Sequence, residues 1–244
     1  MGKFVNCNEE LIFKLLTVFD ISIIEEWLIE GLNKTKYADK YKFEKHSFGH
    51  HPYEHKSAEI SNYNFKVVLF YDDDNMYLSI ERTMMDRNVY DDDFSQFAKI
   101  VFAIVNEKCY DFKTGKENDY KFFFSSLCLK FSLEKRQHSL FEWDCFKGNP
   151  LAAAMPGLKP ESLKYSAKIE SDFIYGLMLD LEFREVIDIV DTKVSVIHCS
   201  FAGEAPYKDF PVEEQIYLVE DATKELLSRK SMLINDLGEN IKNE

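Results

Sequence analysis

Residues 65–82, FKVVLFYDDDNMYLSIER, decide the fold class of this chain. Two runs rich in β-branched and aromatic residues flank a polar stretch that extends from Asp72 to Asn75. Asp and Asn tolerate turn conformations and hydrogen-bond their own backbone, so this stretch predicts a β-hairpin with a loop of about four residues. In the second run, apolar and more polar side chains alternate, which predicts one buried face and one wetter face. The apolar positions of that run are Met76, Leu78 and Ile80.

Helical periodicity brackets this hairpin on both sides. Upstream, Leu11, Leu15 and Phe19 recur at four-residue spacing and predict a helix. Asp20 is placed to cap a second helix, which carries Ile24, Trp27 and Leu28. Downstream, a regular apolar stripe predicts a helix that begins at the acidic residues 91–93, whose carboxylates suit a helix start. The stripe consists of Phe94, Phe97, Ala98, Val101, Phe102 and Val105.

More β-structure and a last helix are predicted in the rest of the chain. A second hairpin is expected around 110–131, with Gly115 in its turn, and two buried strands are expected at 173–183 and 192–201. A final helix begins at about Val212, directly after Pro211. These elements predict an α+β fold with a mostly antiparallel sheet, helices packed on one face, and closure by the C-terminal helix. We expect a single domain over 1–244, built as two β-β-α halves, with 145–160 as the candidate seam.

The chain is acidic, with 43 Asp and Glu against 30 Lys and Arg and a formal net charge of −13. A field of that sign repels phosphate backbones and anionic lipid, so the expected partner is a protein with a basic surface, not nucleic acid or a membrane. Five widely spaced cysteines without a C-x-x-C motif predict reduced thiols in a cytoplasmic protein. The chain also shows no signal-peptide pattern and no apolar run long enough to span a bilayer, so we expect a soluble protein.

Four of the six histidines lie in residues 46–55, within the segment HSFGHHPYEHK. His51 and His55 are four residues apart and, on a helix, would offer two imidazoles to one metal ion. Pro52 disfavours a helix there, so a polar loop is the favoured interpretation of the segment. The alternative is a metal-dependent hydrolase or nuclease that uses the segment His46 to His55, with His51 and His55 as metal ligands.

A second pattern also suggests metal-dependent hydrolysis. Asp180 on one predicted strand, followed by Asp191 and Lys193 on the next, is similar to the restriction-endonuclease-like arrangement, in which carboxylates hold Mg²⁺ and the Lys supports an attacking water. Charged residues make up 30% of the chain, so such spacings also arise by chance, and solvent-facing positions at strand ends are the favoured interpretation. His198 and Cys199 are adjacent on a predicted strand and should point to opposite faces, which excludes a catalytic pair.

The sequence as a whole favours a non-enzymatic function. It contains no glycine-rich phosphate loop, nucleophile elbow, EF-hand loop or zinc-ribbon spacing. We therefore expect an acidic intracellular binding protein that engages a macromolecular partner without a cofactor, such as an inhibitor or immunity-type protein that masks a basic surface. Aromatic side chains beside polar loops are the expected anchors, and the acidic triplet 72–74 is a candidate docking element. The candidate binding residues are Tyr53, Tyr71, Asp72, Asp73, Asp74, Tyr90, Trp143 and Tyr207.

Overall fold

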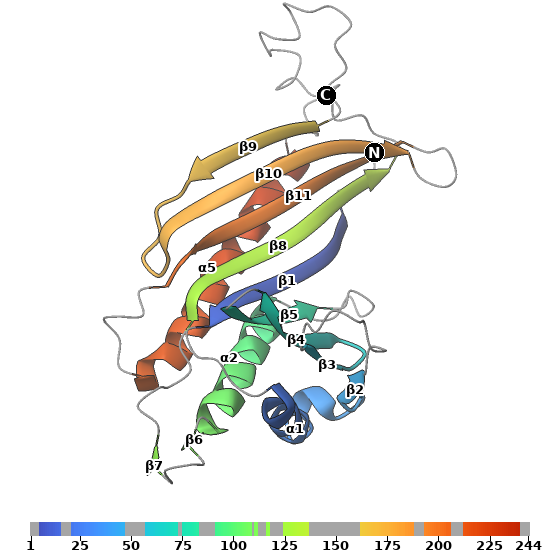
Figure 1. The fold of residues 1–244 in the computed structure, drawn as a ribbon. Helices are drawn as coiled ribbons and strands as arrows, with labels where there is room; N and C mark the ends of the chain where they lie inside the picture. Colours follow the sequence, from blue (N-terminus) through green and yellow to red (C-terminus); the bar gives the residue numbers. More distant parts are fainter. Residues whose placement is uncertain are drawn as a thin grey trace, which may run out of the picture.

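The computed structural model of the chain shows one large antiparallel sheet with helices packed against it (Figure 1). The structure describes residues 5–15, 21–46, 57–72, 75–82, 91–108, 110–111, 116–117, 124–136, 162–187, 193–205 and 212–239. Nine strands form the sheet in the order β2-β3-β4-β5-β1-β8-β11-β10-β9. Their bounds are β1 Val5–Leu15, β2 Glu44–His46, β3 Ser57–Ser61, β4 Phe65–Asp72, β5 Asn75–Arg82, β8 Phe124–Arg136, β9 Ser162–Lys168, β10 Tyr175–Ile187 and β11 Lys193–Glu204.

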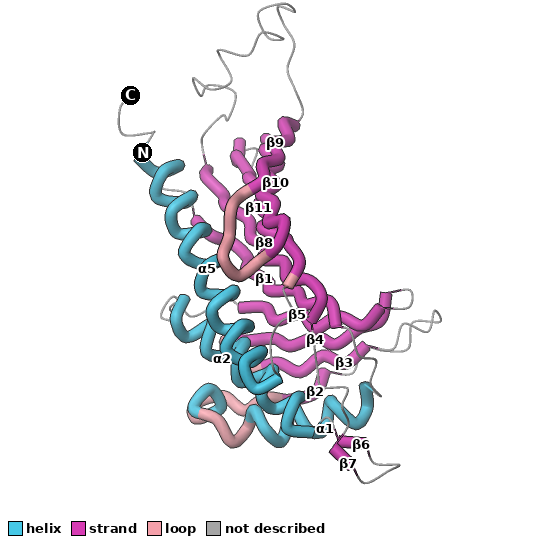
Figure 2. Tube along the Cα trace, turned by 90° about the vertical axis from the view of Figure 1, so that its left-hand side faces the viewer, coloured by secondary structure: helices cyan, strands magenta, loops and turns pink. Residues whose placement is uncertain are grey.

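The described helices lie on one face of this sheet (Figure 2). They are α1 (Ile21–Leu32), α2 (Asp91–Lys108) and α5 (Val212–Glu239), and a short 3₁₀ helix, η1 (Lys36–Ala38), follows α1. We call this side of the sheet the helix face and the opposite side the far face. Figure 1 looks onto the far face of the strands β9, β10, β11 and β8, with α5 behind them. None of the described helices combines the length and the apolar composition that a bilayer crossing requires.

Aromatic side chains fill the space between the sheet and the helices. The Phe13 ring on β1 contacts the rings of Phe102 on α2 and Phe124 on β8, with centroids 4.6 and 5.5 Å apart. The Phe65 ring on β4 stacks on Phe97 of α2 at 4.0 Å. All five side chains are buried, so the predicted apolar stripe of α2 does cover the sheet. Burial of rings of this size is the main source of stability for such a layer packing.

The two halves of the chain repeat one arrangement. The hairpin β4–β5 leads into α2, and the hairpin β10–β11 leads into α5. Between these hairpins, β1 and β8 pair antiparallel at the centre of the sheet, so the strand order runs outward from that pair in both directions. The predicted α+β fold, with a mostly antiparallel sheet, helices on one face and a C-terminal helix, is confirmed. The candidate seam at 145–160 lies outside the described residues.

The prediction of a helix over the first apolar stretch is wrong, because residues Val5–Leu15 form the strand β1. Leu11 and Leu15 fit a four-residue spacing, but Phe13 between them is also buried, while Ile12 and Lys14 are only half-buried. This alternation has the two-residue period of a strand. This segment forms a strand and not a helix because β5 and β8 pair with it on both sides and satisfy the hydrogen-bonding groups of its backbone. The second predicted helix is present as α1.

The two predicted hairpins have different outcomes. The hairpin over 65–82 is present as β4 and β5, with Asp72 opposite Asn75, so the ladder extends further into the turn than the expected four-residue loop allows. Among the described residues of 110–131, only the two-residue strands β6 (Tyr110–Asp111) and β7 (Lys116–Glu117) pair with each other. The long strand β8 pairs instead with β1 and β11, because long-range partners in the sheet satisfy all of its length.

A buried ionic cluster joins the first strand to the last helix. The Glu9 carboxylate on β1 accepts a hydrogen bond from Lys230 Nζ on α5 at 2.5 Å and another from Arg82 on β5. The exposed fractions of the three side chains are 0% for Glu9, 7% for Arg82 and 5% for Lys230. The Arg82 guanidinium also lies over the Phe94 ring of α2. Charges so far from water need their partners, so this cluster fixes α5 on the sheet.

Candidate functional site

Most of the residues predicted to bind a partner or a metal lie outside the described residues. These are Tyr53, Asp73, Asp74, Tyr90, Trp143, Tyr207, His51, His55 and Asp191. Of the others, Tyr71 is half-buried and packs against the core, and Asp72 is exposed at the end of β4. His46 is exposed at the end of β2. Within the described ranges, no three His, Cys, Asp or Glu side chains gather closely enough to hold a metal ion.

The structure keeps Asp180 and Lys193 apart. Asp180 lies opposite Ser200 on β11, whereas Lys193 begins β11 opposite Ile187. Seven positions along a strand correspond to about 23 Å, too far for two groups that would share one attacking water. The described part of this pattern therefore gives no support to the nuclease alternative.

His198 and Cys199 point to opposite faces of β11, as predicted. The His198 side chain is exposed on the far face, and its Nδ1 shares a hydrogen bond of 2.9 Å with the Ser132 hydroxyl on β8. Cys199 faces the core, and burial raises the pKa of its thiol to about 12. A thiol with that pKa is protonated at neutral pH and is a poor nucleophile, so the two side chains do not form a catalytic pair.

The loop between β9 and β10 is held in place by a serine. We call residues 169–174 the pinned loop. The Ser171 hydroxyl donates to the Glu225 carboxylate on α5 at 2.6 Å. The same oxygen accepts hydrogen bonds from the backbone N–H groups of Phe173 and Ile174 at 3.2 and 3.0 Å. One side chain thus both folds the turn and attaches it to the helix behind it.

Two further contacts hold the pinned loop. Arg229 on α5 donates to the Glu170 carbonyl at 2.5 Å and also pairs with Glu225. Ile174 is buried against β11 at Gly203, where an added Cβ atom would approach Ile174 Cγ2 to 2.4 Å. Glycine at 203 is therefore required for the close approach of the loop. Together, these contacts hold the backbone of the loop in one conformation.

A β-bulge directly after the pinned loop changes the direction of Tyr175. Tyr175 pairs with Glu204 and Met178 pairs with Ala202, so β10 contains one extra residue in this interval. Gly176 accommodates the extra residue by adopting a φ of +59°, a backbone conformation that other residues adopt only with strain. Because of the bulge, Tyr175 shares the far face with Glu204, while Leu177 is buried on the helix face. The Tyr175 side chain is consequently 60% exposed.

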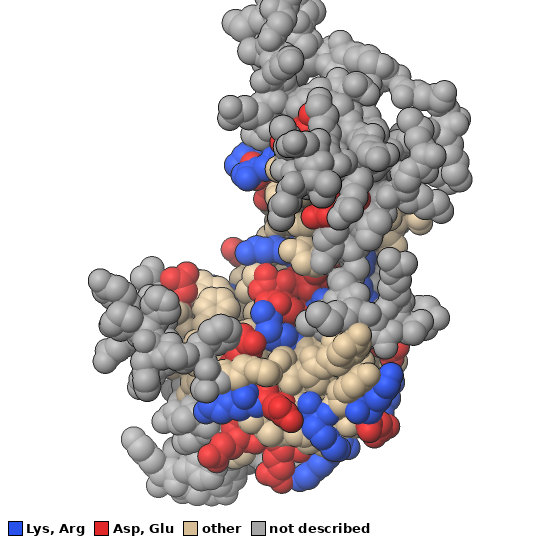
Figure 3. Space-filling model, turned by 90° about the vertical axis from the view of Figure 1, so that its right-hand side faces the viewer, with Lys and Arg blue, Asp and Glu red and all other residues tan. Residues whose placement is uncertain are grey.

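The surroundings of Tyr175 combine aromatic and acidic groups. Phe173 in the pinned loop is 38% exposed. Among the described residues around these rings, Glu170, Asp172, Glu204 and the cation Lys168 are exposed. The loop also lines a hollow of about 860 Å³ that reaches Glu225 and Arg229 on α5. Elsewhere the charge is mixed: Figure 3 shows Lys and Arg interspersed with Asp and Glu on the described surface in view.

The exposed surface formed by Phe173 and Tyr175 was not predicted, because the sequence analysis assigned residues 173–183, FIYGLMLDLEF, to one buried strand. Phe173 precedes the strand and Tyr175 begins it, and both side chains are exposed. The available signals were Ser171-Asp172, a typical turn pair, and the isolated Gly176 inside an apolar run, which favours a bulge.

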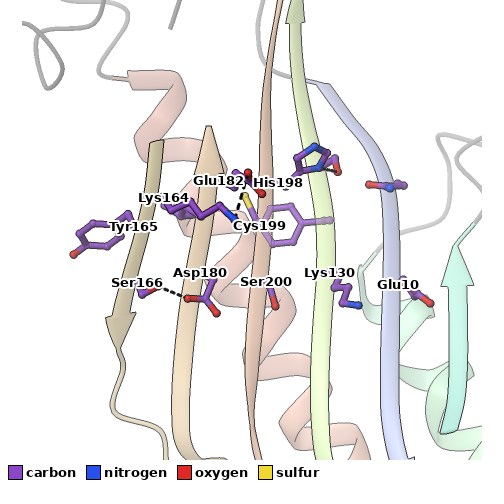
Figure 4. A pocket seen from close by; sticks show the side chains of 14 residues that line it. Glu10, Lys130, Lys164, Tyr165, Ser166, Asp180, Glu182, His198, Cys199 and Ser200 are labelled. Carbon is purple, nitrogen blue, oxygen red and sulfur yellow. Dashed lines mark hydrogen bonds and ion pairs between the residues drawn. The ribbon is translucent and has the colours of Figure 1, made fainter. Parts of the chain in front are cut away.

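A second hollow, of about 420 Å³, lies on the far face across β1, β8, β11, β10 and β9 (Figure 4). We call it the far-face hollow. Its polar side chains stand in two rows that cross the strands, as the strand registers require. One row is Glu10, Lys130, Ser200, Asp180 and Ser166, and the other is Asn8, Ser132, His198, Glu182 and Lys164.

No protein-family model and no curated protein matches this chain.

Proposed function

We propose that this chain is a non-catalytic binding protein that engages a protein partner with a basic surface, in the manner of an inhibitor or immunity-type protein. The observation that carries the proposal is the pinned loop with Tyr175 beside it. Phe173 and Tyr175 are exposed aromatic side chains on a backbone that contacts with α5 and β11 hold in one conformation. Large rigid aromatic side chains contribute most of the binding energy in many protein interfaces.

The charge around these rings supports a basic partner. Among the exposed charges that the structure describes near the pinned loop, Glu170, Asp172 and Glu204 outnumber Lys168, while Glu225 and Arg229 neutralise each other. The whole chain carries a net charge of −13, which would accelerate association with a cationic protein. An acidic rim around aromatic anchors suits a partner surface that has an apolar pocket with Lys and Arg at its border.

The experiment that tests this proposal is site-specific photo-crosslinking in the native host. Tyr175→p-benzoyl-phenylalanine places the reactive ring at the proposed interface. The matched control is Tyr63→p-benzoyl-phenylalanine, because Tyr63 is 41% exposed and lies in the turn between β3 and β4, in the other half of the sheet. We expect a defined cross-linked polypeptide at position 175 and none at position 63.

The cross-linked polypeptide is then purified and its affinity is measured by calorimetry. We expect Tyr175→Ala to weaken binding by at least about tenfold, as the loss of a central aromatic anchor does, with little change for Tyr63→Ala. Binding should also weaken as salt is raised. The proposal is wrong if neither position cross-links, or if the purified polypeptide binds Tyr175→Ala as tightly as the unchanged protein.

A further inference from the structure

The far-face hollow has a centre made of hydrogen-bond donors. The two middle strands, β8 and β11, contribute Lys130, Ser132, His198 and Ser200 to it, and no carboxylate. The carboxylates stand on either side of this centre, with Glu10 on β1 and with Asp180 and Glu182 on β10. The hollow therefore presents positive and hydroxyl groups in the middle and negative groups at two borders (Figure 4).

The bordering carboxylates already accept hydrogen bonds from other protein groups. The Ser79 hydroxyl donates to Glu10 at 2.6 Å, and the Ser166 hydroxyl donates to Asp180 at 2.5 Å. Glu182 accepts from Arg184 at 2.7 Å and lies 3.6 Å from the Lys164 ammonium. These contacts hold the carboxylates in place but leave acceptor capacity, because an ionised carboxylate can accept about four hydrogen bonds.

The Lys130 side chain is exposed and, unlike these carboxylates, makes no contact of this kind with another described residue. Among the described residues, no hydrogen bond or ion pair engages its ammonium group. Lys130 and Ser200 lie directly opposite each other on β8 and β11, and Asp180 lies opposite Ser200 on the next strand. Neighbouring strands are about 4.8 Å apart, so the ammonium of Lys130 and the carboxylate of Asp180 are within the span of one small molecule.

His198 is oriented by its neighbour. The hydrogen bond of 2.9 Å between Nδ1 and the Ser132 hydroxyl fixes the ring and leaves Nε2 without a partner in the described chain. Figure 4 shows the His198 ring and the Lys130 side chain on the same side of the sheet. A group bound between them would meet an ammonium, an imidazole and two hydroxyls.

From this arrangement we infer that the far-face hollow binds a small zwitterion, whose anionic carboxylate or phosphate group contacts Lys130 and His198 and whose protonated amine contacts Asp180. A dianion without an amine is disfavoured, because Glu10, Asp180 and Glu182 repel it. A cation without an anionic group is disfavoured by Lys130. A volume of about 420 Å³ is enough for a ligand the size of an amino acid or a phosphorylated amino alcohol. This site is separate from the proposed partner surface at Tyr175.

The test is an NMR titration that follows the His198 imidazole signals of the full chain. The ligands are a panel of α- and ω-amino acids together with phosphoethanolamine, which distinguishes a carboxylate from a phosphate as the anionic group. Each has two controls, one with an N-acetylated amine and one with an amidated or esterified acid. We expect saturable shifts with at least one zwitterion and loss of binding when either charge is removed from it.

Three variants assign the contacts. Lys130→Gln and Asp180→Asn should each weaken binding by at least about tenfold, because hydrogen bonds to charged groups are stronger than neutral ones. Lys168→Gln, an exposed lysine on the same face outside the hollow, should bind as the unchanged protein does. All three positions are exposed, so the variants should fold, which thermal unfolding verifies. The inference is overturned if no zwitterion of the panel shifts His198, if the amine proves dispensable, or if Lys130→Gln retains full affinity.

Discussion

The buried cluster of Glu9, Arg82 and Lys230 makes a quantitative prediction about stability. Glu9→Gln keeps the shape of the side chain but removes the negative charge between two buried cations. At an effective dielectric constant of about 20, two opposite charges about 4 Å apart attract by ~4 kcal/mol, and Glu9 loses two such interactions. Part of that loss is offset because a neutral side chain avoids the cost of burying a carboxylate. We therefore expect a decrease of about 3–5 kcal/mol in the free energy of unfolding, as for other broken buried pairs.

The assay is urea denaturation at pH 7, followed by circular dichroism and analysed by linear extrapolation. Lys230→Met is the second variant, since it leaves the Glu9–Arg82 pair in place and should cost less than Glu9→Gln. The matched control is Glu182→Gln, which removes a carboxylate whose partner Arg184 is half exposed and should change stability by less than about 1 kcal/mol. If Glu9→Gln loses no more stability than Glu182→Gln, the cluster does not hold α5 on the sheet.

Three further predictions concern packing, thiol chemistry and pH. Gly203→Ala should destabilise the fold by about 1–3 kcal/mol, because the new methyl group meets Ile174 at 2.4 Å; unchanged urea denaturation would contradict this. Burial raises the pKa of the Cys199 thiol to about 12 and also raises the pKa of the Cys128 thiol. At pH 8, iodoacetamide should therefore label both thiols much more slowly in the folded chain than in urea, as followed by peptide mass spectrometry. Equal labelling rates would contradict the burial of these two thiols. Hydrogen bonds from Lys224 and Lys99 lower the pKa of Glu220, so its contribution to stability is present at neutral pH and is lost as the pH falls below its usual pKa. Glu220→Gln should therefore show a smaller loss of unfolding free energy between pH 7 and pH 3 than the unchanged chain.

The elements that sequence reasoning identified correctly are those whose signal is local. The stripe of α2 and the start of α5 at Val212 depend on residues within a few turns of each other. The hairpin of β4 and β5 depends on two neighbouring runs and the turn between them. The strand β1 was missed because Leu11 and Leu15 satisfy both a helical spacing and an alternating one. Only its pairing with β5 and β8, which is a long-range property, decides between them.

The two candidate surfaces were harder to predict, for different reasons. The direction of Tyr175 depends on one extra residue at Gly176, and a change of one position moves a side chain from one face of a sheet to the other. The far-face hollow collects residues from Asn8 to Ser200, which become neighbours only through the strand order. His198, Lys130 and Asp180 have no spacing in the sequence that would connect them, because register between distant strands is not encoded locally.

The central position of the β1–β8 pair has a consequence for synthesis on the ribosome. The strands β1 to β5 are neighbours in the sheet and are all complete once residue 82 has been made, so this part of the sheet can assemble early. One side of β1 then remains an unpaired edge until β8, which ends at Arg136, has left the ribosome. An uncovered central strand with buried Leu11, Phe13 and Leu15 invites pairing with other nascent chains. Synthesis that pauses between these two points should therefore favour aggregation of the nascent chain.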